Sequence, residues 1–146
     1  MRLVLVLLCF SFLFFFLLTD LYYLHIPDLV VCLFFGTIVF YRIFTGGSLY
    51  LLAIDFGLNL LFYTVIYLLF RKGIGMGDVK LLFILGLAFG FKHGYLILLA
   101  ALLVANITVI SGILFQKIKR RQKIPFVPFL LAGFLFYLIL PLEVIT

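Results

Sequence analysis

The sequence predicts an all-α polytopic membrane protein, a compact bundle of six transmembrane helices with both termini on the outer side of the membrane. Composition is the first reason, because 68% of the 146 residues are hydrophobic, only 11% are charged, and the mean hydropathy is +1.44. A soluble domain of this length needs far more polar residues to cover its core. The second reason is that the apolar residues recur in runs along the whole chain, separated by short breaks that hold basic residues. We therefore expect residues 1–146 to form one transmembrane domain.

Six apolar runs are expected to be helices, namely Leu3–Thr19, Leu29–Phe44, Leu49–Phe70, Val79–Phe91, Tyr95–Phe115 and Phe126–Leu140. The first run is interpreted as a retained helix and not a signal peptide, because it lacks a small-residue cleavage site and further apolar runs follow. The third and fifth runs reach the length of about 20 residues that a transmembrane helix needs. The second and fourth are shorter, and the fourth covers only about 20 Å at 1.5 Å per residue.

The distribution of lysine and arginine predicts the orientation, since cytoplasmic loops are enriched in these residues. The breaks after the first, third and fifth runs, with the residue that opens the fourth helix, hold Arg71, Lys72, Lys80, Lys117, Lys119, Arg120, Arg121 and Lys123. The opposite side holds Arg2, Arg42 and Lys92. We therefore expect the first group in the cytoplasm and the chain in the inner (cytoplasmic) membrane. The net charge of +6 does not predict nucleic-acid binding, because no folded soluble element is available to present a basic face.

Acidic residues are scarce, and each one needs a reason because ionisable groups are costly within a membrane. The chain has Asp20, Asp28, Asp55, Asp78 and Glu143. The first, second and fourth of these fall at the expected cytoplasmic ends of helices. Side chains that are far apart in sequence can therefore meet at one face of the membrane, and a pair of carboxylates is possible there.

Asp78 follows three alternating glycines in the segment GIGMGDVK, which allow another chain to approach the backbone closely. We expect Asp78 at a helix N-terminus, where the dipole favours the ionised carboxylate, and Asp20 at a helix C-terminus, where the dipole favours the protonated form. Aspartic proteases use two such carboxyl groups, one to activate water and one to polarise the scissile carbonyl. The sequence predicts Asp78 as base and Asp20 as acid in a coupled pair. The alternatives are a simple N-cap for Asp78 and an interfacial cap for Asp20.

Other polar residues have simpler interpretations. Asp28, after Pro27, is expected to cap the second helix, although its position also allows contact with a substrate. Asp55 and Asn59 share one face of the third helix at i, i+4 spacing and are expected to make an interhelical polar contact. An ion or proton path through these two residues is the alternative. No metal or organic cofactor is expected, because the cysteines form no CxxC pair and each histidine stands alone.

Three segments resemble landmarks of one family, the prepilin peptidases or type IV leader peptidases. The segment GMGDVKL that begins at Gly75 resembles the GxGD signature of that family. Asp20, followed by the Ile-Pro-Asp sequence that ends at Asp28, resembles the family's other aspartate and the turn after it. The segment IPFVPF that begins at Ile124 is similar to a late PFGP-like segment, with Val127 where glycine is usual.

The resemblance implies that Asp20 and Asp78 are the catalytic pair of an aspartyl endopeptidase. Such an enzyme removes a short basic leader, on the cytoplasmic side, from prepilin or pseudopilin-like proteins with a hydrophobic N-terminal helix. We expect the surrounding residues to bind substrate or shape the loops, namely Gly75, Gly77, Lys80, Pro27 and Asp28. Larger family members also carry a zinc-binding N-terminal region and methylate the product. The sequence shows no such region, so a short form without methyltransferase activity is expected.

Two hypotheses from other classes remain beside the peptidase. The first is a small ion- or proton-translocating membrane protein that uses Asp55 and Asn59, with Asn106 along the same path. The second is a non-catalytic relative that binds prepilin during pilus assembly or secretion without shortening it.

Overall fold

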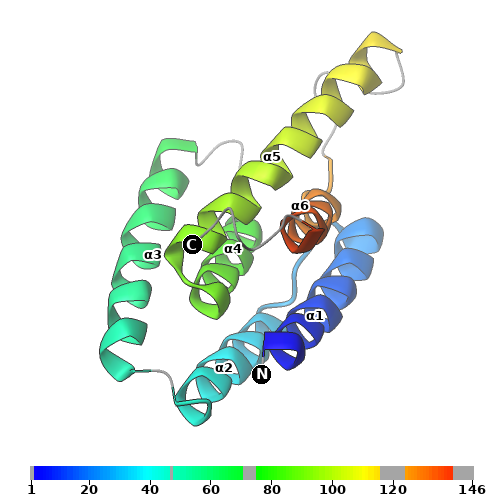
Figure 1. Ribbon diagram of the computed structural model, residues 1–146. Coiled ribbons are helices and arrows are strands. Elements are labelled where there is room, and N and C mark those ends of the chain that lie inside the picture. The colour runs from blue at the N-terminus through cyan, green and yellow to red at the C-terminus, as the bar shows by residue number, and fades with distance from the viewer. Residues whose placement is uncertain (1, 47, 71–74, 116–123, 140–146) are drawn as a thin grey trace.

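A computed structural model describes residues 2–46, 48–70, 75–115 and 124–139 of the chain. In these residues the backbone forms six α-helices and no strand (Figure 1). They are α1 (Arg2–Tyr23), α2 (Asp28–Phe44), α3 (Leu49–Phe70), α4 (Met76–Phe89), α5 (Phe91–Leu114) and α6 (Val127–Ile139). The all-α prediction is confirmed. Three helices, α1, α3 and α5, are long and apolar enough to cross a membrane, which indicates a membrane protein.

The short helix α4 lies at the centre of the bundle. It packs against α2, α3 and α5, while α6 packs along α5 and α1. Seven consecutive or near-consecutive α4 residues are buried, namely Leu81, Leu82, Ile84, Leu85, Gly86, Leu87 and Ala88. A helix that is apolar on every side is suited to the interior of a bundle. The central position of α4 therefore fixes any residue at its start relative to the surrounding helices.

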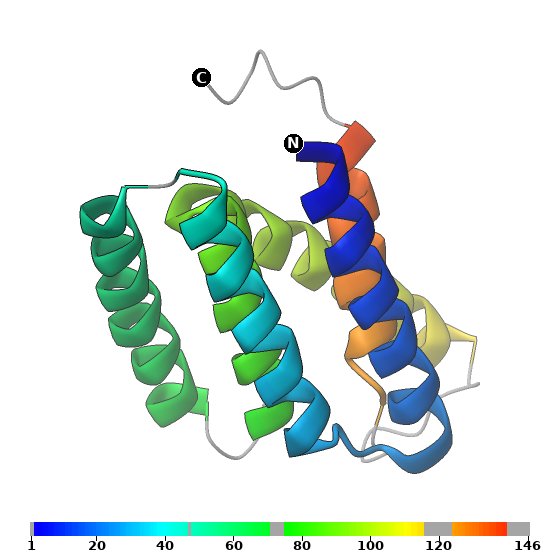
Figure 2. The same cartoon turned by 90° about the horizontal axis from the view of Figure 1, so that it is seen from below.

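The C-terminal end of α1 and the N-terminal ends of α2, α4 and α6 lie at the same end of the bundle, as Figure 2 shows. The turn after α1 helps to bring them there. Leu24 adopts a left-handed conformation with φ of 49°, and its N–H donates to the carbonyl oxygen of Asp20 over 3.0 Å. A non-glycine residue in this region is uncommon and is typical of a helix C-terminus. Pro27 then begins the turn into α2.

The boundaries of three helices, α1, α4 and α5, differ from the prediction by more than one residue. Helix α1 continues to Tyr23, so Asp20 lies in its last turn and does not end it. Helix α4 begins at Met76, and Asp78 is therefore inside its first turn. Helix α5 begins at Phe91, so the predicted break at residues 92–94 is wrong. Only Gly90, with φ of 92°, separates α4 from α5. Polar residues at the start of a helix do not interrupt it when the backbone bonds continue, and the Gly94 N–H donates to the Gly90 carbonyl oxygen.

Most of the residues on which the orientation was predicted lie outside the described part of the chain, namely Arg71, Lys72, Lys117, Lys119, Arg120, Arg121 and Lys123. Glu143 also lies outside it. Lys80 is described and lies in the second turn of α4, where its Nζ pairs with Asp28 at the start of α2.

Candidate active site

Asp20 is a buried carboxylate that connects the last turn of α1 to the first residue of α6. Only 6% of Asp20 is exposed, and its Oδ2 accepts a hydrogen bond from the backbone N–H of Val127 over 3.0 Å. The first N–H groups of a helix have no partner within the helix, and a carboxylate is a favourable partner for them. Asp20 thus faces the N-terminus of α6 as well as the C-terminus of α1. Sequence reasoning missed this bond, because its two residues are 107 positions apart.

Asp78 is the third residue of α4, after Gly75 at the N-cap position. Its carboxylate forms a hydrogen bond with the backbone of Gly75. A side chain at the third position that reaches back to the N-cap N–H is the geometry of a capping box, which fixes the side chain at the helix start. The glycine-rich segment therefore holds Asp78 in place as part of the helix terminus, ahead of the apolar stretch that begins at Val79.

The two carboxylates lie close enough for their charges to interact. The charge of Asp20 acts on Asp78, although the two residues belong to different helices. Two carboxyl groups that interact in this way titrate as a pair, so a proton on one of them affects the other. The assignment of Asp78 as the ionised group and Asp20 as the protonated one stays a prediction.

Gly77 allows the first turn of α4 to pack directly on the connection between α1 and α2. A Cβ atom at Gly77 would lie 3.0 Å from both Cβ and Cδ1 of Ile26, which is tighter than an ordinary contact. Pro27, the next residue, is the N-cap of α2, and its carbonyl oxygen accepts from the N–H groups of Val30 and Val31. The close approach at Gly77 brings α4, and with it Asp78, toward the turn that follows Asp20.

Lys80 and Asp28 form an ion pair between α4 and α2. Their Nζ and Oδ1 atoms are 2.5 Å apart, and the two side chains are 38% and 73% exposed. The hydrogen bond and the positive charge of Lys80 lower the pKa of Asp28. The prediction that Asp28 caps α2 is wrong, because Pro27 is the N-cap and Asp28 is the first helical residue. The carboxylate of Asp28 instead pairs with Lys80 on α4, and the spacing of these residues in the sequence does not indicate such a pair.

Asp55 and Asn59 lie toward the other end of the bundle. Asp55 Oδ2 is 2.8 Å from Arg42 Nη2, and Asp55 Oδ1 accepts from the N–H of Phe91 over 3.4 Å. The predicted interhelical contact is confirmed for Asp55, since these partners belong to α2 and α5. Asn59 instead donates from Nδ2 to the carbonyl oxygen of Asp55 in its own helix. The pair is separate from the carboxylates at the α1–α4–α6 end.

Comparison with known proteins places these residues in a family. The model of the type IV leader peptidase family matches residues 7–110, which include Asp20, Pro27, Asp28 and the segment from Gly75 to Lys80. A curated relative, the prepilin leader peptidase/N-methyltransferase of Bacillus subtilis (strain 168), is 26% identical over 116 residues. The match covers 79% of this chain and 47% of the relative, so the chain spans about half of that protein's length. No solved structure matches the chain significantly. Because the family match extends over most of the 146 residues, the chain belongs to the type IV leader peptidase family.

Proposed function

We propose that this protein is an intramembrane aspartyl endopeptidase that removes the short basic leader of prepilin or pseudopilin-like proteins. The observation that carries the proposal is the electrostatic coupling of Asp20 and Asp78, two carboxylates that are far apart in sequence. Membership of the type IV leader peptidase family supports the same activity. The proposal is limited to hydrolysis of the leader and does not extend to methylation.

The mechanism follows from one proton shared by two carboxyl groups. Asp78, at the N-terminus of α4, acts as the base, and Asp20, in the last turn of α1, holds the proton, as the helix dipoles favour. This assignment keeps the roles predicted from the helix dipole. Asp78 removes a proton from a water molecule, whose oxygen forms a bond to the scissile carbonyl carbon, while Asp20 donates its proton to the carbonyl oxygen. When the C–N bond breaks, the proton on Asp78 passes to the leaving amine and Asp20 regains its own.

Around this pair, Gly75 and Gly77 shape the first turn of α4, while Pro27 and Asp28 with Lys80 form the adjacent rim. We propose that an extended substrate segment crosses the carboxylates between these elements. The exposed carboxylate of Asp28 is suited to contact a basic leader.

We further propose that all six helices belong to one multi-pass domain in the inner membrane, with both termini outside and the carboxylate pair on the cytoplasmic side. The shared position of the α1, α2, α4 and α6 ends supports alternating crossings. Helix α4 has 14 residues. At 1.5 Å per residue it is about 21 Å long, shorter than the ~30 Å hydrocarbon core. A helix this short places Asp78 below the lipid surface or thins the bilayer around it, which brings the site to the level of a substrate's membrane helix.

The test is cleavage of a prepilin by the purified protein in proteoliposomes, followed by mass spectrometry of the product. Asp20→Asn and Asp78→Asn should each lower the rate by about 10²–10⁴-fold, the range for loss of a general acid or base, while thermal unfolding in detergent stays close to wild type. Asp55→Asn is the matched control, because it removes one carboxylate toward the other end and should retain cleavage.

Wild-type cleavage in the Asp20 or Asp78 variant would contradict the proposal. The same vesicles distinguish the ion-translocation alternative, which predicts ion flux that depends on Asp55 and not on the carboxylate pair. A non-catalytic relative would bind the prepilin and leave its mass unchanged.

A further inference from the structure

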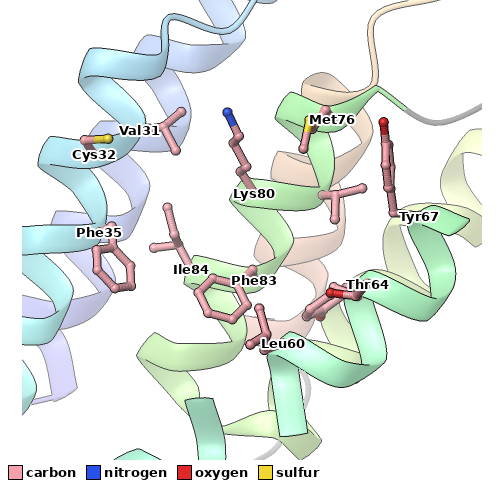
Figure 3. A pocket seen from close by; sticks show the side chains of 12 residues that line it. Val31, Cys32, Phe35, Leu60, Thr64, Tyr67, Met76, Lys80, Phe83 and Ile84 are labelled. Carbon is pink, nitrogen blue, oxygen red and sulfur yellow. The ribbon is translucent and has the colours of Figure 1, made fainter. Parts of the chain in front are cut away.

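An elongated apolar cleft lies between α2, α3 and α4, beside the proposed catalytic end of the bundle. Its volume is about 390 Å³. Each helix contributes residues at helical spacing (Figure 3), namely Val31, Cys32 and Phe35 from α2, Leu60, Tyr63, Thr64 and Tyr67 from α3, and Met76, Val79, Lys80, Phe83 and Ile84 from α4. The proposed mechanism uses none of the α2 and α3 residues.

The spacing of these residues gives the cleft the form of a groove for another helix. Positions i, i+3, i+4 and i+7 form one continuous stripe along a helix, and both α3 and α4 present such a stripe to the cleft. The stripe on α4 extends from Met76 to Ile84, or about 12 Å at 1.5 Å per residue. Both α2 and α3 pack against α4, so α4 forms the floor and the other two form the walls. Grooves with this shape bind one face of an apolar helix through a few of its side chains.

The chemistry of the cleft changes along its length. Phe35, Leu60 and Phe83 lie away from the start of α4, whereas the Lys80 amine and the Tyr67 hydroxyl point toward that start (Figure 3). The carboxylate of Asp28 pairs with Lys80 at the same end. An occupant with an apolar body and a polar end matches this change.

We propose that the cleft binds the apolar helix of the substrate, parallel to α4, with the N-terminal end of that helix beside Asp78. This inference rests on the proposed peptidase function and names the surface that recognises the substrate in the membrane. The lining residues Met76, Val79 and Lys80 flank Asp78 in the chain, so a helix that fills the groove along its length ends at the carboxylate pair. The position of the cleaved bond is therefore set by where the apolar helix of the substrate begins.

Access from the bilayer supports the substrate helix as the occupant. Only Asn59 and Tyr63 are buried among the residues of α3, and Leu60 in the cleft wall is 50% exposed. Because lipid tails are as apolar as a leucine-rich helix, selection depends on close packing and on polar contacts at one end. The apolar stripes on α3 and α4 provide the close packing, and the Asp28–Lys80 pair provides the polar contacts.

The first experiment fills the groove. Thr64→Trp places a large ring in the cleft, and Val65→Trp, its neighbour on α3, places the same ring outside it, because Val65 is 46% exposed and does not line the cleft. For a prepilin with its full apolar helix, we expect Thr64→Trp to lower kcat/KM by at least about tenfold, a change of ~1.4 kcal/mol, mainly through KM. Val65→Trp should stay within about twofold of wild type, the scale of an ordinary surface substitution. Equal rates for the two variants would overturn the inference.

The second experiment locates the helix directly. Photoreactive benzoylphenylalanine is placed at successive positions of the prepilin helix, and crosslinks to the Asp78→Asn protein, which retains the substrate, are mapped by mass spectrometry. Crosslinks to the α2 and α3 walls from positions spaced by three or four residues would support the groove. Crosslinks elsewhere, or with no period, would overturn it. The same photoreactive residue at position 60 in the cleft wall reports the other occupants, and crosslinks from it to a second copy of this chain or to lipid, with none to the prepilin, would also overturn the inference. Failure of the peptidase proposal is a different result, because the wild-type protein would then cleave no prepilin at all.

Discussion

Alanine at Gly94 tests how closely α4 and α5 must approach for the site to keep its geometry. A Cβ atom at Gly94 would lie 2.5 Å from Cα and 3.1 Å from the backbone nitrogen of Gly86. These are backbone atoms of the central helix, so no side chain can rotate away to relieve the contact. Carbon atoms pack at about 3.5–4.0 Å, and the two helices must therefore separate by at least about 1 Å.

The expected magnitude follows from this displacement. Overpacking in a well-packed interior costs about 1–3 kcal/mol, while replacing glycine by alanine in a helix returns up to ~1 kcal/mol. Gly36 in α2 has no atom within 4 Å of its would-be Cβ, so Gly36→Ala experiences the gain alone and is the matched control. We expect Gly94→Ala to be less stable than Gly36→Ala by roughly 1–3 kcal/mol. Because α4 also holds Asp78, a shift of about 1 Å should lower the cleavage rate by as much as 10²-fold.

Thermal unfolding in one detergent and cleavage in proteoliposomes measure both effects. Gly36→Ala should unfold at or slightly above the wild-type temperature and cleave like wild type, while Gly94→Ala should be less stable than Gly36→Ala and cleave more slowly than both. If Gly94→Ala unfolds and cleaves like Gly36→Ala, the close backbone approach of α4 and α5 does not exist in the membrane-embedded protein.

Two further predictions concern the carboxylate pair and the Arg42–Asp55 ion pair. First, kcat/KM should have a bell-shaped pH dependence, because the pair works with one ionised and one protonated carboxyl group; a rate that stays constant while the pair titrates would contradict the shared proton. Second, Arg42→Ala should destabilise the protein by about 1.5–3 kcal/mol, because Asp55 loses a half-buried charged partner at 2.8 Å. In a double-mutant cycle, adding Asp55→Ala should recover much of that loss of stability. Strictly additive effects of the two substitutions would show that the pair contributes nothing.

The sequence predicts the helices well where composition alone decides their limits. Helix α3 matches its predicted bounds, Leu49 to Phe70, because polar and glycine residues border a long apolar run. The prediction fails where polar residues remain helical. Asp20 lies inside α1, and α5 begins at Phe91, before the predicted break at residues 92–94. The backbone hydrogen bonds of a helix end can form whether the side chains there are polar or apolar.

The site was predictable in its residue types and not in its contacts. The scarcity of acids identified Asp20 and Asp78 as candidates, since each carboxylate in so apolar a chain needs a partner. The interaction between Asp20 and Asp78 joins two different helices, which no local pattern encodes. The Lys80–Asp28 pair also joins two helices and is likewise not encoded by a local pattern. The stripe along α4 from Met76 to Ile84 is hidden for another reason, because nearly every residue of that helix is apolar and no contrast marks one face.

The hydrogen bond between Val127 and Asp20 does not depend on the side chain at position 127. Its donor is the peptide nitrogen, which nineteen of the twenty amino acids present in the same way, and proline alone lacks the hydrogen. Valine in place of the usual glycine therefore costs this anchor nothing, and evolutionary drift at position 127 can proceed without touching the carboxylate. A sequence comparison that scores only letters would count the substitution as a loss in a motif whose working atom is unchanged.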